Sequence, residues 1–148
     1  MEKGISTFIR ESFSINEADI KTYSPLTLAY IGDAIFDLII RTAIVSNGNT
    51  NANNLHKSAS SIVKAGTQSE MIEKMIPHLT EEEAGVYKRG RNAKSHTAAK
   101  NASIGDYRRA TGLEALIGYL YLQDKMDRIM ELVKIGLEDM EVPWDTKN

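Results

Sequence analysis

The stretch from Leu26 to Val45 is apolar on nearly every side of a helix, and it constrains the fold more than any other part of the sequence. It is about long enough to cross a bilayer. It also contains Asp33, Asp37 and Arg41, and charged side chains near the centre of a membrane helix are costly. We therefore expect this stretch to be a buried central helix of a soluble, cytoplasmic protein.

A second segment, Leu113 to Leu122, has the same all-round apolar character and also contains one acid, Glu114. The remaining apolar residues recur at helical rather than alternating spacing, so the sequence predicts no strand. Capping and stop signals divide the chain into predicted helices at residues 6–13, 24–46, two within 51–76 separated near Gly66, 80–94, 106–123 and 124–140. A loop is predicted at 96–105, and Trp144 in the tail is expected to pack back onto the fold.

These elements predict an all-α fold of six or seven helices around one core. The 148 residues fit a single domain, 1–148, whose core extends over about residues 24–139. The chain has no cysteine, which excludes a disulfide scaffold, a thiolate zinc site and a cysteine nucleophile. None of its histidines has the spacing of a zinc motif.

Asp33 and Glu114 are unusual because each lies within a helix that is otherwise apolar. A buried carboxylate must be neutralised, paired or bound to a metal ion. Asp37 has Arg41 one turn further on and is expected to form an ordinary ion pair. Asp33 and Glu114 have no base at that position, so spacing alone leaves two interpretations open. They are either paired core acids or the oxygen ligands of Mg²⁺ or Mn²⁺.

Charge is concentrated in one segment of the chain. The formal net charge is −2, yet residues 88–109 contain seven bases and one acid. Such a run is often only a solvated helix face. Here the segment leads into the helix that contains Glu114, where bases would guide a phosphate backbone toward the acids.

Two motifs and the basic block resemble the ribonuclease III family. Residues 30–35, Tyr-Ile-Gly-Asp-Ala-Ile, resemble its signature, and residues 113–122 resemble its second motif. Residues 88–95 and 107–114 are especially similar to the Mini-ribonuclease III branch, a catalytic domain without a double-stranded-RNA-binding domain. The resemblance covers about residues 24–139 and implies the ribonuclease III-like endonuclease fold.

The acid cluster departs from that of ribonuclease III proper. The family places further acids at positions that here are Leu26, Ala29 and Thr111. Only Asp33 and Glu114 therefore carry over as the catalytic and metal-binding acids, with the phosphate completing the coordination of Mg²⁺ or Mn²⁺.

The resemblance further implies a homodimer that hydrolyses double-stranded RNA, leaving 5′-phosphate and 3′-hydroxyl ends. It implies maturation of precursor 23S ribosomal RNA, the RNA of the large subunit, and leaves open whether a ribosomal protein assists. The candidate RNA-binding residues are Lys88, Arg89, Arg91, Asn92, Lys94, Lys100, Arg108 and Arg109.

Two alternatives stay open. One is a helical protein that binds double-stranded RNA without cleaving it. The other is a structural helical protein in which Asp33 and Glu114 are paired core acids.

Overall fold

The computed structural model describes residues 3–94 and 103–145, and these residues form helices and no strand. The helices are α1 (Ile5–Ser12), α2 (Pro25–Ser46), α3 (Ala52–Val63), α4 (Ala65–Met75), α5 (Glu81–Asn92), α6 (Ile104–Leu122) and α7 (Met126–Gly136), with short 3₁₀ helices at Ile20–Thr22 and Ile76–His78. The predicted all-α class is confirmed.

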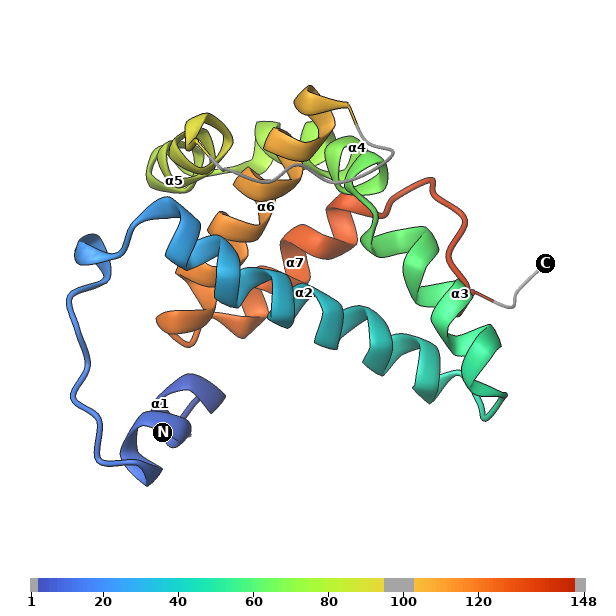
Figure 1. The fold of residues 1–148 in the computed structure, drawn as a ribbon, viewed down its shortest axis with the longest axis horizontal. Coiled ribbons are helices and arrows are strands. Elements are labelled where there is room, and N and C mark those ends of the chain that lie inside the picture. Colours follow the sequence, from blue (N-terminus) through green and yellow to red (C-terminus); the bar gives the residue numbers. More distant parts are fainter. Residues whose placement is uncertain (1–2, 95–102, 146–148) are drawn as a thin grey trace.

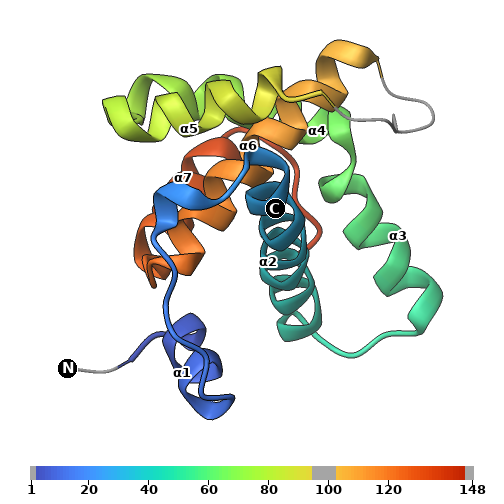
Figure 2. The ribbon, with the colours of Figure 1, turned by 60° about the vertical axis from the view of Figure 1, so that its left-hand side comes forward.

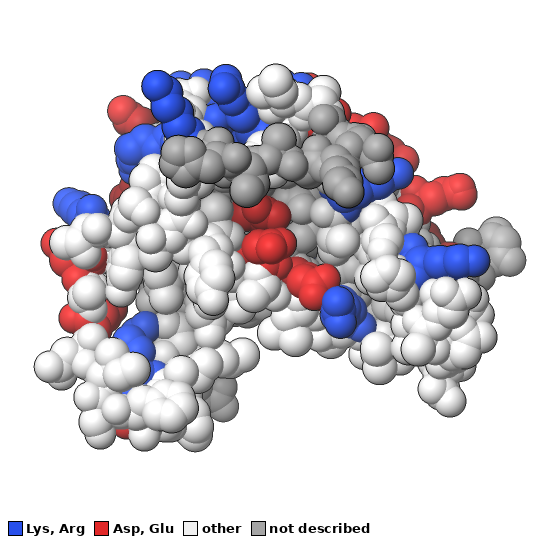
Figure 3. All heavy atoms as spheres, viewed as in Figure 1, with Lys and Arg blue, Asp and Glu red and all other residues white. Residues whose placement is uncertain are grey.

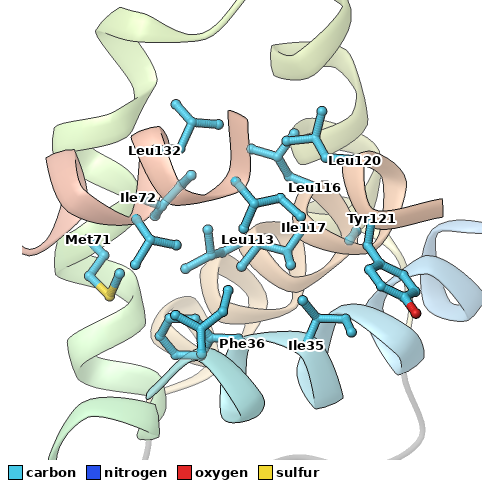
Figure 4. Packing of buried hydrophobic residues seen from close by; sticks show 14 of the residues in the cluster. Ile35, Phe36, Met71, Ile72, Leu113, Leu116, Ile117, Leu120, Tyr121 and Leu132 are labelled. Atoms are coloured by element: carbon cyan, nitrogen blue, oxygen red, sulfur yellow. The ribbon is translucent and has the colours of Figure 1, made fainter. Parts of the chain in front are cut away.

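Helix α6 lies at the centre, with α2 crossing one side of it and α4, α5 and α7 packed around the rest (Figure 1). Its side chains Leu113, Leu116, Ile117 and Leu120 are almost completely buried. They meet side chains from α2, α4 and α7, including Phe36 (Figure 4). Full burial of one such side chain stabilises a fold by about 1.5–3 kcal/mol, so this contact region dominates the packing.

Two predicted helix starts are confirmed by the hydrogen bonds of their capping residues. The Ser24 hydroxyl accepts a hydrogen bond from the Thr27 amide at 3.2 Å. Thr80 and Glu83 form a reciprocal capping box, with bonds of 2.9 and 3.1 Å. Each cap satisfies an amide that the first helical turn leaves unpaired.

Two predicted boundaries were wrong. The break between α3 and α4 falls at Lys64, whose extended backbone ends one helix and begins the next, and not at Gly66, which lies inside α4. Helix α7 begins at Met126 and not at Asp124, because Asp124 has a positive φ of 59°. The predicted loop at 96–105 falls mostly outside the described residues.

Asp124 instead caps the distant helix α1. Its carboxylate accepts hydrogen bonds from the Ser6 amide at 3.1 Å, from the Thr7 amide and from the Thr7 hydroxyl. Helix α1 projects from the body of the protein and has little other contact with it (Figure 2). A single carboxylate therefore holds this helix at its N-terminus.

The remaining predictions concern α2 and the tail. No helix in the described ranges has the length and apolar character that crossing a membrane requires. Trp144 is partly buried against the core, as predicted.

Candidate active site

Two glycines set the closeness of the α2–α6 crossing. A Cβ on Gly32 would collide with the backbone carbonyl oxygen of Glu114, and a Cβ on Gly118 would collide with that of Leu28. The two backbones are therefore in direct contact, which only residues without a side chain allow. This contact fixes Asp33, which follows Gly32, beside Glu114, which precedes Gly118 by one turn.

The two acids share an open cavity of about 850 Å³ between α2 and the first half of α6. Asp33 is exposed, contrary to the burial expected from its apolar neighbours, whereas Glu114 is mostly enclosed. Figure 3 shows a row of acidic side chains across α6 and α2 on this face. A solvent-facing carboxylate next to an enclosed one gives a site that a ligand can enter from outside.

Burial and the neighbouring Asp33 carboxylate raise the pKa of Glu114 to about 8, and a hydrogen bond with Asp33 adds to the effect. The only opposing influence is a hydrogen bond of 3.3 Å from the Gln68 side-chain amide. Two adjacent acids in this environment are stabilised as anions by a cation. The structure thus brings together the two acids that the sequence singled out.

The donor set fits a small hard cation. No group of three or more potential ligands among His, Cys, Asp and Glu gathers within the described residues. Two carboxylates are nonetheless enough for Mg²⁺, which keeps several waters and commonly binds one or two protein carboxylates together with substrate phosphates.

Two other polar residues of the cavity, Asp37 and Thr111, have structural partners. Asp37 forms the predicted ion pair with Arg41, at 2.8 Å. Thr111 is buried, and its hydroxyl donates a hydrogen bond of 3.0 Å to the Tyr107 carbonyl oxygen one turn earlier. Asp37 is therefore a paired acid at the edge of the site.

A second glycine contact places the basic end of α5 against α6. A Cβ on Gly90 would lie 3.0 Å from the Gly112 Cα and 2.8 Å from the Ala115 Cβ. Basic side chains gather over α5 at the upper left of Figure 3. The crossing thus holds these cations on the same helix, α6, that contains Glu114.

The predicted RNA-binding residues differ in how free their side chains are. Lys88, Arg89, Asn92, Lys94 and Arg108 are exposed, whereas Arg91 and Arg109 are partly buried, and Lys100 lies outside the described residues. The Arg91 guanidinium lies 5.6 Å from the centre of the Tyr87 ring. Arg109 donates to the Ser69 hydroxyl at 2.7 Å and lies 3.3 Å from the Asp106 carboxylate. These contacts give Arg109 a structural role in joining α4 to α6.

Sequence reasoning missed Gln68. Its side chain lies on α4, is only 2% exposed and contacts the Glu114 carboxylate. A polar residue at a helix position that should face the core was the available signal, but its partner on α6 is visible only in the structure.

A carboxylate pair at the crossing of two central helices, with cations held on the neighbouring helix, has the parts that hydrolysis of a nucleic-acid backbone needs. The family model described as the ribonuclease III domain matches residues 26–125. The Mini-ribonuclease 3 of Clostridium tetani is 51% identical over 129 residues, which cover 86% of this chain and 84% of that protein. The Mini-ribonuclease 3 of Enterococcus faecalis is 50% identical over 117 residues, covering 78% and 89%.

A crystal structure of a protein from Fusobacterium nucleatum superposes with a TM-score of 0.74 at 37% identity, covering 80% of this chain and 96% of that one. The chain therefore belongs to the ribonuclease III family, in its Mini-ribonuclease 3 branch. It is an endoribonuclease of the class that acts on double-stranded RNA.

Proposed function

We propose that this protein is a Mg²⁺-dependent endoribonuclease that trims precursor 23S ribosomal RNA within a duplex, in the cytoplasm. The observation that carries the proposal is the contact of α2 and α6 that brings Asp33 beside Glu114. The family relationship supplies the duplex-RNA substrate class.

Asp33 and Glu114 would hold the ion, with Mn²⁺ as a substitute for Mg²⁺. A bound Mg²⁺ lowers the pKa of water and offsets charge on the phosphate. The exposed Asp33 meets the incoming backbone, while the enclosed Glu114 is shielded from solvent. Water attacks the phosphorus in line as the bond from phosphorus to the 3′ oxygen breaks. One product keeps the 5′-phosphate, and the departing 3′ oxygen takes up a proton to become the 3′-hydroxyl.

The basic residues would bind the RNA, because the described residues form no separate RNA-binding domain. Lys88, Arg89, Asn92, Lys94 and Arg108 are the exposed candidates, and Arg91 stands beside them against Tyr87. Contacts from these side chains to phosphates would follow the shape of the duplex rather than its sequence. Lys100 is included on the basis of the sequence. Arg109 is the least available of these residues for RNA, because its side chain already contacts Ser69 and Asp106.

Cleaving both strands of a duplex calls for two sites, and we propose a homodimer. Tyr30 is 82% exposed on α2, and Leu26 and Leu38 on the same helix are also exposed. Such apolar side chains on a central helix suit a two-fold interface. A ribosomal protein that presents the precursor RNA is a further partner to test.

The test is a cleavage assay with end-labelled duplex RNA, in Mg²⁺ or in EDTA. Wild type should cut only with Mg²⁺, and Asp33→Asn and Glu114→Gln should bind the RNA without cutting it. Asp37→Asn is the matched control, an acid one turn further along α2 that is paired with Arg41 and should leave cutting intact.

Two results would contradict the proposal. If wild type binds the duplex and never cuts it, the protein is a non-catalytic RNA binder. If either acid variant cuts like wild type, that acid does not belong to the site.

A further inference from the structure

The side chain of Gln68 makes two contacts that join three helices. Its amide nitrogen donates to the Val63 carbonyl oxygen at 2.8 Å and to Glu114 Oε2 at 3.3 Å. Val63 is the last residue of α3, Gln68 lies in the first turn of α4, and Glu114 lies on α6. Gln68 therefore ties the α3–α4 corner to one carboxylate of the site.

The two partners dictate which way the amide points. Both are oxygen atoms that accept hydrogen bonds, so the NH₂ group must face them and each of its hydrogens has one acceptor. The opposite orientation would set the amide oxygen against two other oxygens. The direction of the Gln68 amide thus follows from chemistry.

This orientation leaves the Gln68 Oε1 atom buried without a hydrogen-bond partner among the described residues. An unpaired buried acceptor costs a fold about 1–3 kcal/mol, and an apolar side chain of the same size would avoid that cost. A residue that served packing alone would have no reason to be an amide here. The bond to the Val63 carbonyl oxygen uses one hydrogen of the amide, and the bond to Glu114 uses the other.

A contact made by the next residue of α4 fixes the position of α4 relative to α6. Ser69, the next residue, accepts a hydrogen bond from Arg109 Nε at 2.7 Å. Arg109 lies five positions before Glu114, so two consecutive residues of α4 hold α6 at two separate points. The 3.3 Å bond to Glu114 is therefore set by a fixed pairing of helices and not by one free side chain.

We propose that Gln68 is a positioning residue that holds the Glu114 carboxylate in the orientation in which it binds the divalent ion. The inference rests on the proposed function. An amide donor suits this task because it fixes one carboxylate oxygen, Oε2, without adding charge, and leaves Oε1 of Glu114 to the ligand. Groups that hydrogen-bond to ligating carboxylates typically change metal affinity or activity 10–100-fold when they are removed.

The test substitutes Gln68→Met, an apolar side chain of similar length. Mn²⁺ binding is measured by calorimetry without RNA, and cleavage of duplex RNA is measured across Mg²⁺ concentrations. We expect a 10–100-fold weaker affinity for Mn²⁺, a lower kcat that rises again with added Mg²⁺, and a KM for RNA within threefold of wild type. The midpoint of thermal unfolding should fall by only a few degrees, because methionine loses the bond to the Val63 carbonyl oxygen but also removes the unpaired Oε1 atom.

Gln123→Met is the matched control, because the Gln123 amide donates to the Tyr119 carbonyl oxygen at 2.8 Å and to no carboxylate in the described chain. It should bind Mn²⁺ and cut RNA like wild type. If Gln68→Met does not fold, Gln68→Asn decides, since it retains the amide but falls one methylene short of Glu114. Weaker Mn²⁺ binding by that variant supports the positioning role.

Wild-type Mn²⁺ affinity in a folded Gln68 variant would overturn the inference, provided that Glu114→Gln has lost Mn²⁺ binding in the same experiment. If wild type itself neither binds Mn²⁺ nor cuts duplex RNA, it is the proposed function that fails. The two failures are therefore distinguishable.

Discussion

In EDTA, the Glu114→Gln substitution should stabilise the protein at alkaline pH. Burial and Asp33 raise the pKa of Glu114 from 4.5 to about 8 in the folded state. A raised carboxyl pKa stabilises the fold fully only below the unfolded value, and this stabilisation is lost as the pH rises toward the folded value. A pKa difference from 4.5 to about 8, at about 1.4 kcal/mol per pH unit, sets a ceiling of roughly 5 kcal/mol above pH 8.

The assay is urea unfolding of wild type and Glu114→Gln at several pH values from 5 to 9. The two curves should nearly coincide at pH 5 and separate with rising pH, with the variant more stable by roughly 3 kcal/mol at pH 7. Glu70→Gln, which removes an exposed glutamate, is the control and should not diverge from wild type. A Glu114→Gln protein less stable than wild type at pH 8 would refute the reasoning and make Glu114 a paired core acid.

Three further predictions concern the scaffold. Gly118→Ala should lower the free energy of unfolding by about 3 kcal/mol, because its Cβ would collide with the α2 backbone. Gly66→Ala is the control and should cost little, since no atom lies closer than 4.0 Å to its Cβ. Equal losses in urea unfolding would disprove the close contact of α2 and α6. The Arg128 guanidinium holds the pKa of Glu83 below 4.5, so their pairing stabilises the fold above that pH and is lost as the pH falls through the folded-state value. Arg128→Met should cost about 3 kcal/mol at pH 7 and flatten the acid limb of the stability curve, and an unchanged limb would contradict the pairing. Asp124→Ala should cost about 2 kcal/mol, roughly half from the lost cap of α1 and half from placing alanine at the positive φ of this position. It should also expose the first amides of α1 to hydrogen exchange, and unchanged protection there would argue against the cap.

Much of the fold followed from local signals in the sequence. The Ser24 cap and the capping box at Thr80 predicted two helix starts correctly. The apolar character of α6 predicted its burial correctly, whereas α2 is buried on one side only and leaves Tyr30 and Leu38 exposed. The misplaced start of α7 arose where a tertiary contact decides. Asp124 resembles an N-cap for the helix that follows, yet its carboxylate is used by α1, more than 100 positions earlier.

The two acids of the candidate site could be predicted from the sequence, but the residues that hold them in place could not. Asp33 and Glu114 stood out because each is a carboxyl group in an apolar helix. Their closeness depends on Gly32 and Gly118, and the sequence does not show which backbone a glycine within a helix will contact. Gln68 was missed for the same reason, since its role depends on a partner 46 positions away.

The closeness of α2 and α6 has a consequence for synthesis, because Asp33 and Glu114 are separated by about 80 positions of the chain. At roughly 5–20 residues per second, translation adds the second acid roughly 4–16 s after the first. Until then, the apolar sides of α2 have no α6 to cover them, and the nascent chain carries half a site. The pair of acids therefore cannot form during synthesis until α6 has been added and has packed against α2.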